Sequence, residues 1–324
     1  MFAAIAVTGA LVFIRSSRPV TRPRIDVAGA LLGGLGVFLI VFGFAHAETA
    51  GWSAALTVGS LVLGVLLIAA LGLAERRVRY PLLPLRLILD RTRGGAYLSV
   101  GVAAVALFGA FLFFTYYLQT VKGYSPVTAG LAFLPMIGGL LVSANVSSNV
   151  LLPRIGPRIL ISSGLLTGAA AMAYLTQLSV TSSYARGVLP ALILLGLAFG
   201  MILAPAIKTA TTGVRAQHSG VASALVNTMQ QVGGSIGASA LSTVALSATA
   251  GYLAAHPASP LALEIAAVHG YTVAFTVSAA LFALGAVLAF TLPTRAELAQ
   301  RRSASVPAAA RRRMCPPPPA AVPL

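Results

Sequence analysis

Long uncharged apolar stretches, each about the length of a membrane-crossing helix, dominate this sequence. Crossing a hydrocarbon core of roughly 30 Å takes about 20 mostly apolar residues as a helix. Eight stretches reach that length, and they cover residues 27–45, 52–74, 95–118, 126–150, 159–180, 188–207, 220–248 and 271–292. Only 9% of the residues are charged, against about 25% in a soluble domain. The sequence therefore predicts an all-α, polytopic membrane helix bundle with eight full transmembrane helices.

A ninth apolar stretch, residues 1–14, is short for a full crossing. We interpret it as a partial N-terminal transmembrane helix whose beginning is missing. A signal peptide is the weaker interpretation, because no basic residue precedes the stretch and no small-residue cleavage site follows it.

The basic residues predict how the chain is oriented in the membrane. The chain has 22 Lys and Arg and a net charge of +16. All of them except Lys122 and Arg186 fall in alternate loops or in the tail, and loops that stay in the cytoplasm carry such an excess. We therefore expect a cytoplasmic C-terminus and no nucleic-acid partner. The same count places residue 1 outside or within the membrane, which predicts a truncation that removed an odd number of helices.

Two segments outside the apolar stretches are strongly basic. Residues 75–93 combine six Arg with a Leu/Ile set, and we expect this segment to lie along the lipid surface. The tail from 293 to 324 contains Arg clusters and a run of proline, so we expect it to be disordered. The excess of Arg over Lys, with abundant Ala, suggests a GC-rich bacterial source and hence a bacterial plasma membrane.

The stretch 220–248 is the most polar, and its polar residues recur every four positions. Asn227, Gln231, Ser235 and Ser239 can share one face of a helix, with Gln231 near the membrane midplane. Amide groups at that depth need partners, either on neighbouring helices or in a water-filled cavity with a ligand. Gln230 adds a further amide. We favour the cavity and predict that Asn227, Gln230, Gln231 and Ser235 bind substrate, while hydrogen bonding between helices stays open.

Two other polar pairs lie near the ends of their stretches. Asn145 and Asn149 are expected at the inner mouth, as part of a gate or of a helix end. Tyr116 and Tyr117 are expected at the outer mouth, where an aromatic belt is the alternative to ligand contact.

Residues for acid–base, metal or cofactor chemistry are missing from the apolar stretches. All six acidic residues lie at stretch ends, in loops or in the tail, and neither HExxH nor GxSxG occurs. The single cysteine, Cys315, excludes an intramolecular disulfide and a cysteine metal cluster. We expect no enzyme, no cofactor and no metal site.

Several short motifs together resemble one transporter family. Their order and spacing are similar to those of the fourteen-helix drug:proton antiporters of the major facilitator superfamily, and the residues are Tyr117-Leu118-Gln119, Gly123-Tyr124-Ser125-Pro126, Ala129-Gly130-Leu131 and Leu134-Pro135. The segments 75–87 and 220–234 and the connector 18–26 also resemble that branch.

The resemblance implies a domain organisation. Residues 1–14 would be a partial helix, and residues 15–94 a cytoplasmic connector, two linker helices and the interfacial basic segment. Residues 95–292 would form the six-helix C-terminal transport bundle, and 293–324 the tail. Five helices would be missing, an odd number as the charge count requires.

The resemblance also implies a function, multidrug or metabolite efflux with a role in antibiotic resistance. The substrate would be a hydrophobic or cationic small molecule, exchanged for protons in the intact protein. Residues 152–158 resemble a gating loop that would include Arg154, Gly156 and Arg158, although Pro153 replaces the acidic residue of the family pattern. The coupling carboxylates would belong to the missing half. A non-transporting membrane fragment, or a half-transporter that needs a separate N-terminal partner, is the alternative.

Overall fold

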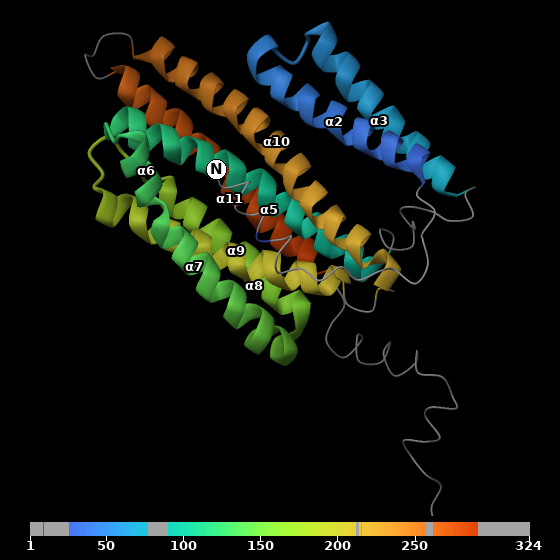
Figure 1. Cartoon of the computed structure of the whole chain (residues 1–324). Helices are drawn as coiled ribbons and strands as arrows, with labels where there is room; N and C mark the ends of the chain where they lie inside the picture. Colours follow the sequence, from blue (N-terminus) through green and yellow to red (C-terminus); the bar gives the residue numbers. More distant parts are fainter. Residues whose placement is uncertain are drawn as a thin grey trace, which may run out of the picture.

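The computed structural model describes Gly9 and residues 26–76, 90–211, 214, 216–256 and 262–290 (Figure 1). In these ranges every regular element is helical, as predicted for an all-α membrane protein. The elements are α2 (Val27–Ala50), α3 (Ala55–Glu75), α5 (Arg91–Tyr116), η1 (Tyr117–Val121), α6 (Pro126–Ala132), α7 (Leu134–Val146), η2 (Ser147–Leu151), α8 (Leu152–Leu175), η3 (Tyr184–Val188), α9 (Leu189–Thr211), α10 (Ala216–Ala255) and α11 (Ala262–Ala289). The expected helix 1–14, the interfacial segment and the tail fall largely or wholly outside the described residues.

Each of the eight predicted spans coincides with a helical segment. The described residues contain seven helices long and apolar enough to cross a membrane, and one of these, Pro126–Leu175, is 50 residues long. That segment contains the predicted span 126–150 and most of the span 159–180. It changes direction at Gly156, whose φ of 79° and ψ of 169° are not helical and which precedes Pro157. A glycine adopts this positive φ without the steric cost that a Cβ would add.

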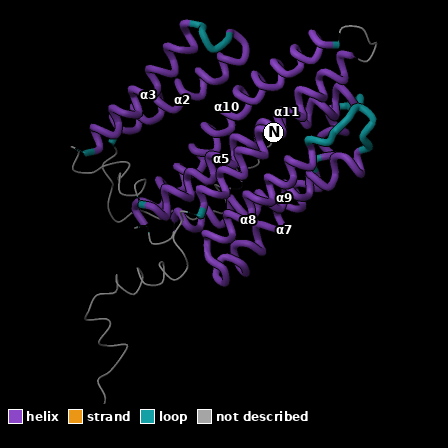
Figure 2. The backbone as a smooth tube through the Cα atoms, turned by 180° about the vertical axis from the view of Figure 1, so that it is seen from behind, coloured by secondary structure: helices purple, strands orange, loops and turns teal. Residues whose placement is uncertain are grey.

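The helices form a bundle with a second layer on one side (Figure 1). Helix α9 packs against α7, α8 and α5, and α5 also packs against α10 and α11. The pair α2 and α3 forms a hairpin that contacts the rest of the chain through α2 and α10. The view from behind shows the same separation between the hairpin and the bundle (Figure 2). Helix α10 therefore lies between the hairpin and the bundle.

The two ends of the bundle differ in charge. We call one end the basic end, because Arg76, Arg93, Arg154, Arg158 and Lys208 lie at the helix termini that meet there. The opposite end holds the connections 51–54, 122–125 and 176–183. The sides of the helices expose many Leu, Val, Ile and Phe side chains, which suits helices that face lipid.

Aromatic and small residues fill the interior of the bundle. Phe114 and Phe275 are fully buried, with ring centroids 5.5 Å apart. Gly233 and Gly237 of α10 lie directly against the backbone of α5 at Gly101 and Val105. Small residues allow this close approach, which is the main way in which helices associate in lipid.

Candidate functional site

Two serines of the polar stripe on α10 hydrogen-bond to the hairpin. The Ser235 hydroxyl donates to the carbonyl oxygen of Val41 at 3.1 Å, and the Ser239 hydroxyl donates to that of Phe44 at 2.6 Å. Both acceptors belong to α2. The structure thus places this half of the predicted stripe in contact with a neighbouring helix.

The contact continues to the opposite end through two more polar pairs. The Ser242 hydroxyl lies 3.2 Å from Oε1 of Glu48, to which it donates. The indole Nε1 of Trp52, in the connection between α2 and α3, donates to the Thr243 hydroxyl at 3.0 Å. We call Ser235, Ser239 and Ser242 the serine ladder. Hydrogen bonding between helices was the alternative that the sequence left open for this face, but the four-residue spacing does not identify α2 as the neighbouring helix.

The other half of the stripe is arranged differently. Asn227 and Gln231 are exposed and Gln230 is half-buried, and none of the three amide side chains hydrogen-bonds within the described ranges. An amide in an apolar span is stable only where it meets a polar partner, because a lost hydrogen bond in hydrocarbon costs several kcal/mol. These amides therefore mark a surface of α10 suited to water, a ligand or further protein.

An aromatic ring of α5 packs on α10 about one helical turn from Gln231. A methyl group added at Gly234 would approach Cγ of Phe108 to 2.9 Å, so the Phe108 ring covers this glycine. Gly234 follows Gln231 by three residues, which is nearly one helical turn. Phe108 is nevertheless 42% exposed. This part of α10 thus carries amide groups within about one or two helical turns of a partly exposed aromatic ring, a feature that the sequence did not single out.

The two asparagines of the predicted inner mouth lie toward the basic end. Asn145, in α7, donates through Nδ2 to the carbonyl oxygen of Leu141 at 2.8 Å. Asn149, in η2, is exposed. Beside it, Nζ of Lys208 donates to the Ser148 carbonyl oxygen at 2.9 Å, which joins the end of α9 to η2.

The two tyrosines of the predicted outer mouth have different surroundings. Tyr116 is 44% exposed, whereas Tyr117 is fully buried. The Tyr117 hydroxyl donates to the carbonyl oxygen of Ser179 at 2.9 Å. Nζ of Lys122 donates to the carbonyl oxygen of Val180 at 2.8 Å and lies 5.6 Å from the Tyr117 ring centroid. Tyr117 and Lys122 therefore hold the connection 176–183 against the bundle.

The segment that resembles a gating loop forms the start of α8. Arg154 is exposed and Gly156 is the point where the chain changes direction. The Arg158 guanidinium lies 5.5 Å from the ring centroid of Phe290, just after α11. This cation–π contact joins α8 to the end of α11 at the basic end.

Metal-binding clusters are not found in the part of the chain that the structure describes, where no three His, Cys, Asp or Glu side chains gather. The arrangement is one of neutral polar groups and aromatic rings on apolar helices. It can hold a small molecule by hydrogen bonds and ring contacts.

Comparisons with known proteins identify the family. The sequence model of the Major Facilitator Superfamily matches residues 1–238. The chain is 46% identical to the puromycin resistance protein of Streptomyces alboniger over 308 residues. These aligned residues make up 94% of this chain and 61% of that protein. It is 34% identical to the cephamycin export protein of Amycolatopsis lactamdurans, over 72% of this chain and 48% of that protein.

A third relative extends the pattern. The chain is 31% identical to the tetracenomycin C resistance and export protein of Streptomyces glaucescens, over 73% of this chain and 44% of that protein. The chain thus spans about half the length of these curated relatives. The names of these relatives agree with the drug-efflux branch that the motifs indicated. The superfamily consists of transport proteins rather than enzymes. With more than half of its residues matched, the chain belongs to the major facilitator superfamily.

Proposed function

We propose that this chain forms the C-terminal part of a multidrug or metabolite exporter in a bacterial plasma membrane. In the intact protein, export is driven by protons. The observation that supports this proposal best is the pair of exposed amides, Asn227 and Gln231, on a transmembrane helix. The partly exposed Phe108 ring packs on Gly234, about one helical turn from Gln231.

The amides and the ring define the substrate class. Amide groups carry no net charge, so they bind polar atoms of either a cation or a neutral molecule. The face of an aromatic ring attracts a cation and also contacts apolar groups. A hydrophobic or cationic small molecule fits both. Gln230 contributes from the same turn, and Ser235 borders the path while its hydroxyl contacts α2.

The proposed orientation follows the charge of the two ends. The basic end faces the cytoplasm, and so does the C-terminus, because cytoplasmic loops carry the excess of Lys and Arg. Asn145 and Asn149 then line the inner mouth and Tyr116 the outer mouth, with Tyr117 supporting it from within. Arg154, Gly156 and Arg158 form the hinge of a gate between α7 and α8.

Proton coupling is assigned to a part of the exporter other than the described helices. The acidic residues in the described ranges are Asp26, Glu48, Glu75, Asp90 and Glu264, and all lie at or near helix ends. A carboxylate that carries protons across the membrane lies within the bundle in known relays. The coupling carboxylates then come from an N-terminal half, made either in one chain or as a separate partner.

Dye efflux tests this proposal. The chain is expressed in an efflux-deficient bacterium, alone and together with the N-terminal part of the Streptomyces alboniger relative, and export of the hydrophobic cation ethidium is measured. Co-expression is expected to give efflux that collapses when the proton gradient is removed. Replacing both Asn227 and Gln231 with Leu should lower this efflux at least tenfold, because about two hydrogen bonds of roughly 1 kcal/mol each are lost.

The matched control is Thr276→Val, which removes an exposed hydroxyl from α11 and should leave efflux unchanged. Membrane insertion of every variant is checked by fractionation. Unchanged efflux in the double variant would remove the site assignment. Co-expression that yields no efflux of ethidium or of puromycin would favour the alternative, a membrane fragment without transport activity.

A further inference from the structure

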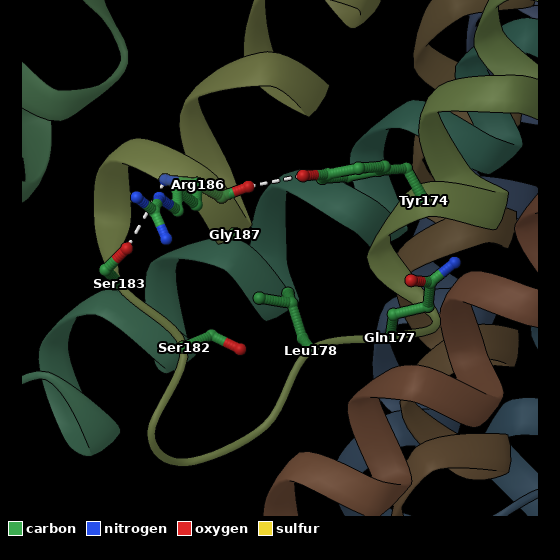
Figure 3. Close-up of a pocket in the computed structure, with 7 residues that line it drawn as sticks. All are labelled: Tyr174, Gln177, Leu178, Ser182, Ser183, Arg186 and Gly187. Carbon is green, nitrogen blue, oxygen red and sulfur yellow. Dashed lines mark hydrogen bonds between the residues drawn. The ribbon is translucent and has the colours of Figure 1, made fainter.

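A small cavity lies at the opposite end, away from the surface proposed for substrate. It is formed where α8 ends and η3 begins, and its volume is about 270 Å³ (Figure 3). Sites for drug-sized ligands typically have volumes of roughly 300–1,000 Å³. The cavity is therefore better matched to a smaller chemical group.

The charge of the lining points to an anion. Arg186 lines the cavity, and the lining contains no carboxylate. The Arg186 side chain is exposed, and its guanidinium forms no ion pair or hydrogen bond within the described ranges. By the charge count, Arg186 is one of only two basic residues expected at this end, and the other, Lys122, already donates to the Val180 carbonyl oxygen.

A neutral donor, the Ser183 hydroxyl, accompanies the guanidinium. The Ser183 hydroxyl accepts the backbone N–H of Arg186 at 3.4 Å, so its own hydrogen stays available for donation. Gln177 also lines the cavity, but its amide points away from the Arg186 guanidinium (Figure 3). The Tyr174 hydroxyl donates to the Arg186 carbonyl oxygen and thereby fixes the arginine backbone across the cavity (Figure 3). A guanidinium group with a neighbouring hydroxyl donor is well suited to a phosphate group.

The exposed side of α8 that leads from the cavity toward the middle of the helix is suited to acyl chains. Leu166, Ala170 and Tyr174 follow one another at four-residue intervals on α8, so they lie along one side of that helix. All three are exposed, Leu166 by 51% and Tyr174 by 38%. Tyrosine and arginine at the end of a transmembrane helix lie at the level of the lipid headgroups.

We propose that this cavity binds the phosphate of an anionic phospholipid headgroup, with the acyl chains along the exposed side of α8. The Arg186 guanidinium pairs with the phosphate oxygens, and the Ser183 hydroxyl donates to a remaining one. A net anion is favoured because the lining supplies one positive charge and no negative charge. In the orientation proposed above, the lipid would belong to the outer leaflet. This assignment of the leaflet rests on the proposed function, whereas the binding site itself does not.

Native mass spectrometry of the full chain in detergent tests the site directly. Phosphatidylglycerol, phosphatidylcholine and inorganic phosphate are titrated separately. We expect phosphatidylglycerol to bind most tightly and Arg186→Gln to weaken it about tenfold or more, because hydrogen bonds to a charged group are lost. Arg186→Lys keeps the charge without the planar fork and should lose less.

Arg76→Gln is the matched control, since Arg76 is an exposed arginine at the basic end, and it should leave this binding unchanged. A thermal melt of each variant confirms that it is folded. Equal loss in the Arg76 variant, or full binding of phosphatidylglycerol by Arg186→Gln, would overturn the site. Arg186-dependent binding of inorganic phosphate without binding of phosphatidylglycerol would overturn its assignment to a lipid. This experiment measures lipid binding and not efflux, so its failure can be distinguished from failure of the proposed function.

Discussion

The serine ladder leads to a quantitative prediction about how the hairpin is held. We consider the double replacement of Ser235 and Ser239 by alanine. Each hydroxyl donates to a carbonyl oxygen of α2, and each of those carbonyls, at Val41 and Phe44, is inside a helix where it also accepts a backbone N–H. Removing the hydroxyls therefore leaves no acceptor without a partner.

The expected cost follows from this geometry. Side-chain hydrogen bonds between membrane helices contribute about 0.6 kcal/mol on average. Two of them give about 1.2 kcal/mol, or roughly a sevenfold shift of the docking equilibrium toward the separated hairpin. The value would be larger if a carbonyl were stranded, which is not the case here.

Tryptophan fluorescence can measure this shift. Trp52 is the one tryptophan of the chain, and its Nε1 is bonded to Thr243 across the same contact. Its emission in a titration of mixed micelles with SDS reports whether the hairpin is docked. Ser278→Ala is the matched control, because within the described residues the buried Ser278 hydroxyl bonds only to the Ala274 carbonyl oxygen of its own helix, at 2.9 Å.

The control removes no hydrogen bond between α10 and α2, so its effect on the Trp52 transition should be smaller than the roughly 1.2 kcal/mol expected for the double variant. If the double variant shifts it by no more than the control, the ladder does not hold the hairpin. Packing of apolar side chains between α2 and α10 would then account for the contact.

Two further predictions concern the packing of the bundle. Gly237→Ala would place a methyl group against the α5 backbone, so it should lower the free energy of unfolding by about 1–3 kcal/mol; a thermal melt in detergent checks this, and an unchanged melting temperature would contradict the close contact. Arg158→Gln removes the cation over the Phe290 ring and should destabilise the bundle by about 0.5–1 kcal/mol; the same melt with Arg158→Lys, which keeps a cation, should show a smaller loss, and equal losses would argue against the ring contact.

The positions of the helices were predictable from the sequence because they depend on local composition. A run of uncharged apolar residues can satisfy its backbone in lipid only as a helix. All eight spans predicted within residues 27–292 accordingly coincide with helical segments. The reversal between α7 and α8 was also marked locally, by Pro153, Gly156 and Pro157.

The surroundings of the polar residues were less predictable, because they depend on which helix is the neighbour. Asn227, Gln231, Ser235 and Ser239 share one face by spacing alone, yet among the described residues the two serines hydrogen-bond to α2 and the two amides do not. Tyr117 lies next to Tyr116 in the sequence, but its hydroxyl bonds to a connection more than 60 residues away. Spacing within one helix contains no information about such contacts.

The contact between α7 and α9 has a consequence for motion. Methyl groups at Gly196 or Gly200 would collide with the α7 backbone, and the Ser143 hydroxyl donates to the Leu197 carbonyl oxygen at 2.7 Å. Sliding one helix along the other would bring side chains against a backbone that now meets only glycine, so the two helices are held in this register. We therefore expect α7 and α9 to tilt together. A gate in this bundle would open by a rigid-body movement of this helix pair rather than by displacement of a single helix.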